Sequence, residues 1–249
     1  MFLYVANWKM NLSFYEAGEL CVENYQEFQD LSELPGKKVV LCPSYINLIP
    51  TLGLFEDCCD EVEIGAQNCS AYEFGPYTGQ VSAASLAEVG CTYCIVGHSE
   101  VREHFSEGDQ EVAEKVVRLL ENNIIPILCI GERKELYSLN TAKEFLLSQL
   151  EPVFKRIKGW GDMQLCIAYE PIWSIGTGIT PEIEYIEKIF EYIFEIGKKM
   201  APNAEIALLY GGSVNENNVK NMKSIANLGG FLIGSASLDF KKFEKIVQL

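Results

Sequence analysis

Five polar side chains stand where apolar, strand-like runs of the sequence end. Asn7 and Lys9 close one such run, His98 and Glu100 follow a second, and Glu170 ends a third. A carboxylate can take a proton from one carbon and return it to the next, and an imidazole can donate a hydrogen bond to a developing oxyanion. A lysine that ends an apolar strand has to reach solvent or an anion. Together these residue types could carry acid–base chemistry and bind an anion.

The elements that have to position these groups are eight apolar runs, which alternate with segments of helical period. The runs cover residues 2–8, 38–42, 62–67, 91–97, 125–131, 164–170, 206–211 and 230–234. Their near-continuous hydrophobicity is typical of parallel strands that are covered on both faces. Eight βα units without an inserted domain favour a closed eight-stranded parallel (β/α)8 barrel over an open doubly wound sheet, with residues 1–249 as a single catalytic domain. Active sites of such barrels lie at the carboxyl ends of the strands, where the five polar residues stand.

Helix start signals occur between the strands. Ser13 and Glu16 match a capping box, and Asp109 is expected to cap a helix that begins next to it. Thr180 followed by Pro181 predicts an N-cap with proline at the first helical position.

The composition restricts the class of protein. The formal net charge of −15 argues against nucleic acid or an anionic membrane as a partner, so an anionic substrate needs a local positive site. The sequence contains no apolar run of the roughly 18 residues that a membrane-spanning helix needs, and Met1 is not followed by a signal peptide, which predicts a cytoplasmic protein. The nine cysteines are odd in number and mostly lie in apolar runs, so we expect reduced core residues, including the Cys91 and Cys94 of a C-x-x-C, and no metal.

Six short motifs give the chain a resemblance to the triosephosphate isomerase family, which covers its whole length. In chain order the motifs are Asn7-Trp8-Lys9-Met10-Asn11, Val96-Gly97-His98-Ser99-Glu100, Cys129-Ile130-Gly131-Glu132, Ala168-Tyr169-Glu170-Pro171-Ile172-Trp173, Ile175-Gly176-Thr177-Gly178 and Tyr210-Gly211-Gly212-Ser213-Val214. Each motif alone is modest, but their order and separations together are specific. The resemblance implies a TIM barrel that interconverts dihydroxyacetone phosphate and D-glyceraldehyde 3-phosphate, in glycolysis and gluconeogenesis, without a cofactor.

The resemblance also implies roles for individual residues. Glu170 matches the catalytic base, His98 the electrophile that hydrogen-bonds the enediolate, and Lys9 and Asn7 the groups that stabilise negative charge. Glu100 is expected to pair with Lys9 and position it, with Ser99 as a second supporting residue. His104, which stands outside any strand end, is expected to be solvated or structural.

The phosphate group is expected to bind backbone N–H groups at the ends of strands and at the start of a short helix. The positions are Gly176, Ser213, Gly234 and Ser235. The family usually has two consecutive glycines where this chain has Gly234 and Ser235. This departure raises the question whether a serine can adopt the required backbone angles, because glycine has greater conformational freedom.

Two loops are also implied by the resemblance. Residues 171–178 match the lid that closes over the site, and the family is itself a reference case for such closure. Residues 74–79 match the loop that enters the partner subunit of a homodimer. The family commonly pairs a glutamate with an arginine at the positions of Gln80 and Val101, so one interface ion pair is absent here as a unit.

Two alternatives stay open at this point. Another phosphate-binding barrel, such as an aldolase or a tryptophan-pathway enzyme, would need a central Schiff-base lysine or different strand-end acids. A catalytically degraded barrel that only binds sugar phosphates or protein partners would have lost a catalytic residue, whereas Asn7, Lys9, His98 and Glu170 are all present.

Overall fold

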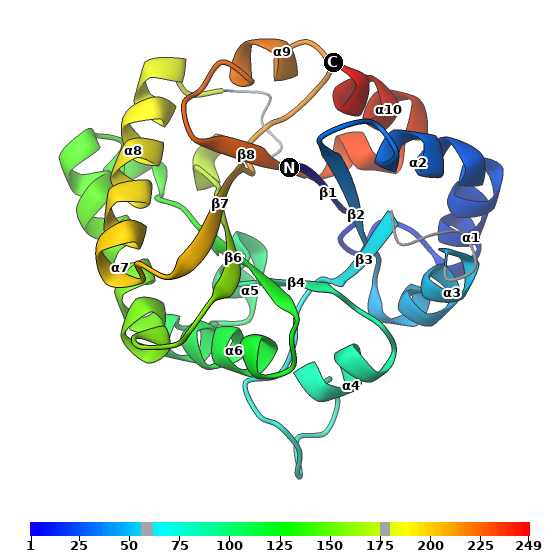
Figure 1. Cartoon of the computed structure of the whole chain (residues 1–249), viewed down its shortest axis with the longest axis horizontal. Coiled ribbons are helices and arrows are strands. Elements are labelled where there is room, and N and C mark those ends of the chain that lie inside the picture. The colour runs from blue at the N-terminus through cyan, green and yellow to red at the C-terminus, as the bar shows by residue number, and fades with distance from the viewer. Residues whose placement is uncertain (56–61, 175–179) are drawn as a thin grey trace.

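The computed structural model describes residues 1–55, 62–174 and 180–249. Within these residues eight parallel strands close into a barrel, each strand pairing with the next and the last with the first (Figure 1). The strands are β1 (Phe2–Asn7), β2 (Lys37–Cys42), β3 (Val62–Ala66), β4 (Tyr93–Val96), β5 (Ile125–Ile130), β6 (Met163–Tyr169), β7 (Ala204–Tyr210) and β8 (Leu228–Ile233). The predicted closed eight-stranded parallel barrel is confirmed.

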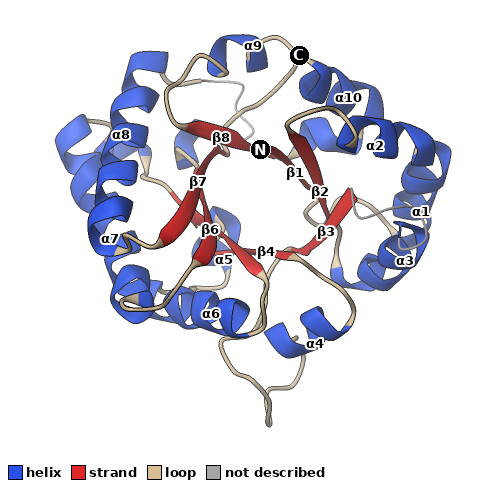
Figure 2. Cartoon of the chain, in the orientation of Figure 1, coloured by secondary structure: helices blue, strands red, loops and turns tan. Residues whose placement is uncertain are grey.

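Helices surround the ring of strands (Figure 2). They are α1 (Phe14–Glu23), α2 (Tyr25–Ser32), α3 (Tyr45–Phe55), α4 (Ala83–Glu88), α5 (Ser99–His104), α6 (Asp109–Glu121), α7 (Leu139–Ile157), α8 (Ile183–Met200), α9 (Val219–Met222) and α10 (Phe240–Gln248). Short 3₁₀ helices also occur in the described residues, namely η2 (Lys134–Leu136), η3 (Ile172–Ser174) and η4 (Ser235–Leu238). None of the helices in the described ranges is long and apolar enough to cross a bilayer.

The helix start signals were partly right. The capping box at α1 is confirmed, since the backbone N–H of Glu16 donates to Ser13 Oγ and that of Ser13 donates to Glu16 Oε2. Asp109 was wrong as a cap: Gly108 holds that position, and the Asp109 carboxylate instead accepts a hydrogen bond from Arg102.

The predicted start of α8 was also wrong. Its N-cap is Glu182, two residues beyond the expected Thr180. The Thr180 hydroxyl instead accepts a hydrogen bond from the side chain of Asn218 (3.3 Å), in the loop after β7. A tertiary contact therefore replaces the local cap that the sequence suggested.

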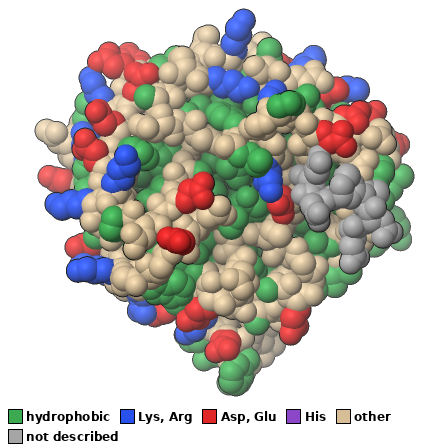
Figure 3. Space-filling view, in the orientation of Figure 1, with side chains coloured by type: hydrophobic (Ala, Val, Ile, Leu, Met, Phe, Trp, Pro, Cys, Tyr) green, Lys and Arg blue, Asp and Glu red, His purple; other side chains and the backbone are tan. Residues whose placement is uncertain are grey.

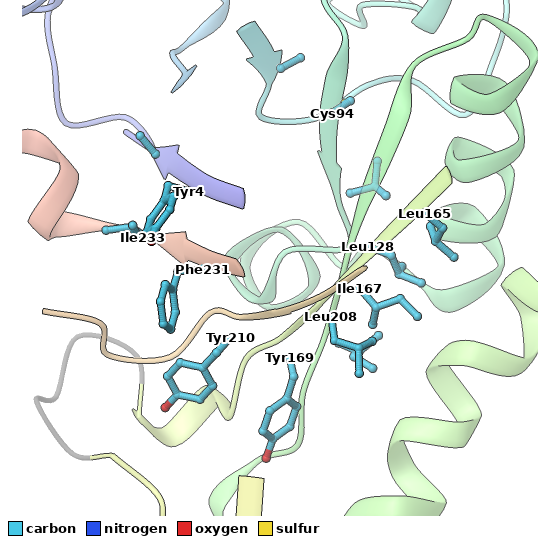
Figure 4. Close-up of a cluster of buried hydrophobic side chains, with 14 of the residues drawn as sticks. Tyr4, Cys94, Leu128, Leu165, Ile167, Tyr169, Leu208, Tyr210, Phe231 and Ile233 are labelled. Carbon is cyan, nitrogen blue, oxygen red and sulfur yellow. The ribbon is translucent and has the colours of Figure 1, made fainter. Parts of the chain in front are cut away.

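Two apolar layers stabilise the barrel. Outward-facing strand residues such as Tyr4, Ile167 and Phe231 pack with helix residues in one large cluster (Figure 4). A second cluster contains strand residues only, including Leu3 and Val5, and therefore fills the barrel interior. Figure 3 shows charged side chains scattered over this face of the molecule, with hydrophobic side chains visible between them towards the middle.

The inner face of each strand leads directly to the mouth of the barrel. Side chains alternate along a strand, so Asn7 continues the inward-facing series of Leu3 and Val5 on β1. Glu170 continues the series of Cys166 and Ala168 on β6 in the same way. The strand period thus aims both polar groups into one space above the apolar interior.

The cysteines of the described ranges are all free and buried. Cys58 and Cys59 lie outside those ranges. Burial raises the pKa of Cys91 to about 11, and that of its C-x-x-C partner Cys94 is also raised, chiefly by burial. Both thiols therefore stay protonated and unreactive near neutral pH, as expected of core residues.

Candidate active site

A cavity of about 570 Å³ opens at the carboxyl ends of the strands, and most of the predicted site residues line it. Those that do are Asn7, Lys9, His98, Glu100, Glu170, Ser213, Gly234 and Ser235. Ser99 is buried as the first residue of α5 and is not part of the lining that the described residues form. Gly176 lies outside the described residues.

Glu170 is positioned at the end of β6, where only 2% of its surface is exposed. Its backbone N–H donates to the carbonyl of Ile130 (2.8 Å), which extends the ladder between β5 and β6 by one residue. Its Oε1 atom lies 3.3 Å from Nε2 of His98. The carboxylate and the imidazole therefore face each other across the floor of the cavity.

His98 has a defined protonation pattern because it caps α5. The backbone N–H of Glu100 donates to Nδ1 of His98 (3.3 Å), so this nitrogen must carry no proton. The neutral ring then carries its proton on Nε2, the atom that faces Glu170. Burial is the largest single influence and lowers the pKa of His98, but the charge and hydrogen bond of Glu170, together with the charge of Glu100, act in the opposite direction, and the net shift of the pKa is upward. A ligand that separates His98 from Glu170 removes the upward contribution of Glu170 and favours the neutral ring.

Lys9 reaches the cavity through an unusual backbone conformation. Its φ angle is 53°, in the left-handed region that few residues other than glycine adopt. The backbone around it is held by hydrogen bonds: its N–H donates to Asn7 Oδ1 (3.1 Å), and its carbonyl accepts from Gln67 Nε2 (2.8 Å). Its ammonium donates to Glu100 Oε1 at 2.6 Å. The structure therefore places Glu100 against Lys9 in the manner expected.

Two glycines leave the space that Glu170 occupies, and neither was among the predicted site residues. A Cβ on Gly211, at the end of β7, would lie 2.7 Å from Cγ of Glu170. A Cβ on Gly131, after β5, would lie 1.7 Å from the carbonyl oxygen of Glu170. Gly131 and Gly211 each stand two residues after an inward-facing strand residue, Cys129 and Leu209. This alternation could have been used to predict that both glycines face the site.

The far end of the cavity is lined by short turns. Ser213 Oγ donates to the carbonyl of Ser174 (2.5 Å), which fixes the turn after β7. The backbone N–H of Ser237 donates to the carbonyl of Gly234 (2.8 Å), so Ser235 and Ala236 occupy the first positions of η4. N–H groups at such positions have no partner within the turn and are available to an anion.

The backbone at Ser235 is compatible with a serine in place of the family's usual glycine. Its φ angle is not among the positive values found in the described residues, so its backbone conformation is accessible to serine. Its side chain is exposed. The serine at this position therefore does not strain the turn.

Glu132 is a further buried carboxylate that the sequence reasoning quoted only as part of a motif. It follows β5, is 0% exposed, and its Oε1 accepts hydrogen bonds from the Tyr169 hydroxyl (2.9 Å), Trp173 Nε1 (3.3 Å) and the Tyr185 hydroxyl (3.4 Å). It thus connects β6, the start of the 171–178 loop and α8. A carboxylate that directly ends an apolar strand was the available signal.

Burial makes Glu132 a source of pH-dependent stability. Burial raises its pKa above the ordinary value of 4.5, although its hydrogen bonds act in the opposite direction. A carboxyl group whose pKa is raised by folding stabilises the protein below the unfolded value and loses that contribution as pH rises through the folded value. We therefore expect the wild type to lose stability relative to Glu132→Gln as pH rises above about 4.5, measured by urea unfolding at several pH values. A constant difference between the two proteins would contradict the assignment.

The fold and the site define a class of protein. A closed parallel barrel that collects a carboxylate, an imidazole and an ammonium around a cavity at its carboxyl end is an α/β-barrel enzyme scaffold. Comparison with known proteins identifies the family: the model described as "Triosephosphate isomerase" matches residues 2–249. The chain therefore belongs to the triosephosphate isomerase family, which confirms the resemblance read from the motifs.

Named relatives agree over the full length. A triosephosphate isomerase of Wolbachia pipientis wMel is 40% identical over 99% of this chain and 93% of the relative. One of Amoebophilus asiaticus (strain 5a2) is 38% identical over 99% and 98%, and one of Aquifex aeolicus (strain VF5) is 36% identical over 98% and 98%.

Proposed function

We propose that the protein is an isomerase that interconverts dihydroxyacetone phosphate and D-glyceraldehyde 3-phosphate, a step of glycolysis and gluconeogenesis. The observation that carries this proposal is the placement of the Glu170 carboxylate 3.3 Å from His98 Nε2, in one cavity with Lys9. This arrangement offers a base, a hydrogen-bond donor and a cation to one small substrate.

In the proposed mechanism Glu170 takes a proton from C1 of dihydroxyacetone phosphate, and the electrons of the C–H bond form the C1–C2 double bond of an enediolate. The former carbonyl oxygen gains negative charge, which the Nε2–H of His98 and the ammonium of Lys9 stabilise. Return of the proton to C2 and transfer of a hydroxyl proton give the aldehyde. The contact between Glu170 Oε1 and His98 Nε2 has to separate before the substrate can lie between the two side chains.

The phosphate group is proposed to bind at the other end of the cavity. Backbone N–H groups of Ser213, Gly234 and Ser235 are the donors, together with Gly176, and the side chain of Asn7 adds a neutral donor near the reacting carbons. Ser213 to Ser235 span the turns after β7 and β8, which supports a grip shared by two strands. Backbone N–H groups can bind a phosphate group without cationic side chains, which are few in this acidic protein.

The effect of Ser235 on phosphate binding can be measured directly. Since its backbone is outside the left-handed region, Ser235→Gly should leave the affinity for inorganic phosphate within about twofold of the wild type. Calorimetry on wild type, Ser235→Gly and Ser235→Ala side by side tests this. Tighter binding by the glycine variant alone would indicate strain, worth roughly five- to 150-fold if all of it appears in binding. A loss beyond about tenfold in both variants would assign the phosphate contact to the hydroxyl.

We also propose that residues 1–249 form one catalytic domain, that the protein works in the cytoplasm, and that it forms a homodimer.

The loop between β3 and α4 projects away from the barrel (Figure 1), and Phe74 near its tip is 84% exposed. The rings of Tyr72 and Tyr77 stack with centroids 3.8 Å apart, which gives the loop a preformed shape. A partner subunit would cover this apolar tip. Gln80 is exposed and Val101 is half-buried, so an interface there would lack the charged pair.

A coupled assay with dihydroxyacetone phosphate tests the proposed function. Turnover that depends on Glu170 would support isomerisation. Binding of the substrate without turnover would instead favour the degraded barrel that only binds sugar phosphates. The two outcomes are separated by measuring substrate affinity and product formation on the same preparation.

A further inference from the structure

The charges around the cavity are unfavourable for a phosphate dianion. Among the described residues of its lining, the charged ones are Lys9, Lys242, Glu100, Glu170 and Glu216. Three carboxylates thus oppose two ammonium groups, in a chain whose formal net charge is −15. Because Lys9 donates to Glu100 at 2.6 Å, its charge is already matched by a near neighbour. The phosphate end of the cavity is left with Glu216 and Lys242.

Lys242 stands next to the proposed phosphate site. It is the third residue of α10, the helix that follows η4, and it lines the cavity together with Gly234 and Ser235. Its side chain is 53% exposed, and Nζ lies 3.7 Å from Asp239 Oδ2, longer than a hydrogen bond. The ammonium is therefore loosely held and can respond to an anion in the cavity.

The start of α10 holds the backbone of this lysine but leaves its ammonium weakly paired. The carboxylate of the N-cap Asp239 accepts a hydrogen bond from the backbone N–H of Lys242 (3.3 Å), and the first turn itself contains no acidic residue. The adjacent Lys241 has other partners: its Nζ lies 3.5 Å from Glu244 Oε2 and 5.5 Å from the centroid of the Phe240 ring. Lys241 does not line the cavity that the described residues form.

We propose that Lys242 is a specificity-determining residue that attracts the phosphate group of the substrate into the cavity and offsets Glu216. This proposal rests on the proposed function. The ammonium acts through its field at the phosphate end, away from Glu170 and His98. It therefore favours binding of a phosphorylated over an unphosphorylated triose without taking part in proton transfer.

The test compares Lys242→Gln, Lys242→Glu and Lys242→Arg with the matched control Lys241→Gln. At an ionic strength of about 10 mM, kcat/KM for dihydroxyacetone phosphate should fall about threefold in Lys242→Gln and about tenfold in Lys242→Glu, through KM. Arginine should preserve the wild-type value, and Lys241→Gln should leave it unchanged. In about 0.5 M salt the differences should largely disappear, because exposed charges are then screened.

A second measurement separates this proposal from the proposed function. Calorimetry with inorganic phosphate should show weaker binding to Lys242→Gln than to the wild type and to Lys241→Gln. If the wild type fails to isomerise dihydroxyacetone phosphate, the proposed function falls, while the phosphate affinities still decide the role of Lys242. Equal effects of the two lysine variants, a loss confined to kcat, or differences that persist in high salt would overturn the proposal.

Discussion

Glu170→Gln is expected to lower kcat about 10³-fold while KM changes by less than about threefold. The amide has nearly the same shape as the carboxylate, so it can keep its place at the end of β6, where only 2% of the residue is exposed. It cannot accept a proton from carbon, and the base acts mainly in the transition state. Steady-state kinetics in both directions, with dihydroxyacetone phosphate and with glyceraldehyde 3-phosphate, measure the loss.

The matched control for this variant is Glu216→Gln. Glu216 is another carboxylate of the same cavity, at the phosphate end, so removing its charge should leave kcat close to the wild-type value. A Glu170→Gln enzyme with near-native kcat, or two variants equally impaired, would remove Glu170 from the role of base.

His98→Asn is expected to lower kcat about 10²-fold or more while the free energy of unfolding stays within about 0.5 kcal/mol of the wild type. Asparagine is a favoured N-cap, so its side-chain oxygen can replace Nδ1 as the acceptor for the N–H of Glu100. Its amide does not extend to the position of Nε2, 3.3 Å from Glu170, and the donor to the enediolate oxygen is lost. Chemical denaturation and turnover measured on the same protein separate the two effects.

His104→Asn provides the control, because His104 is the exposed last residue of the same helix. We expect its turnover to match the wild type. If His98→Asn unfolded, or if it kept full turnover, His98 would be a structural residue and the hydrogen-bond donor to the enediolate would have to be sought elsewhere.

The sequence predicted the barrel well because each strand is a separate apolar run and the polar residues stand at the strand ends. Even Pro126, which cannot donate to a strand ladder, fits this pattern, because it is the second residue of β5 and pairs with Cys94 near the start of the strand. The helix starts at Asp109 and Thr180 were misplaced because both side chains are used in tertiary contacts, which local patterns do not contain.

The sequence was sufficient to predict the reacting groups of the site, but not the residues that hold those groups in position. The side chain of Gln67 donates a hydrogen bond to the carbonyl of Lys9, and Gly211 leaves room for the side chain of Glu170. Neither residue has a reactive group from which its role could have been predicted. Their importance arises from distances between segments far apart in the chain. The triple contact of Glu132 is of the same kind, since its donors come from three separate elements.

Closure of the barrel between β8 and β1 determines when the cavity can exist during protein synthesis. Lys9 is translated more than 200 residues before Gly234 and Ser235, which line the same cavity on the other side of the β1–β8 seam. A nascent chain that still lacks β8 has an open seam beside β1 and no turn to receive the phosphate. The complete lining of the cavity can therefore form only after β8 and the turn that follows it have been synthesised.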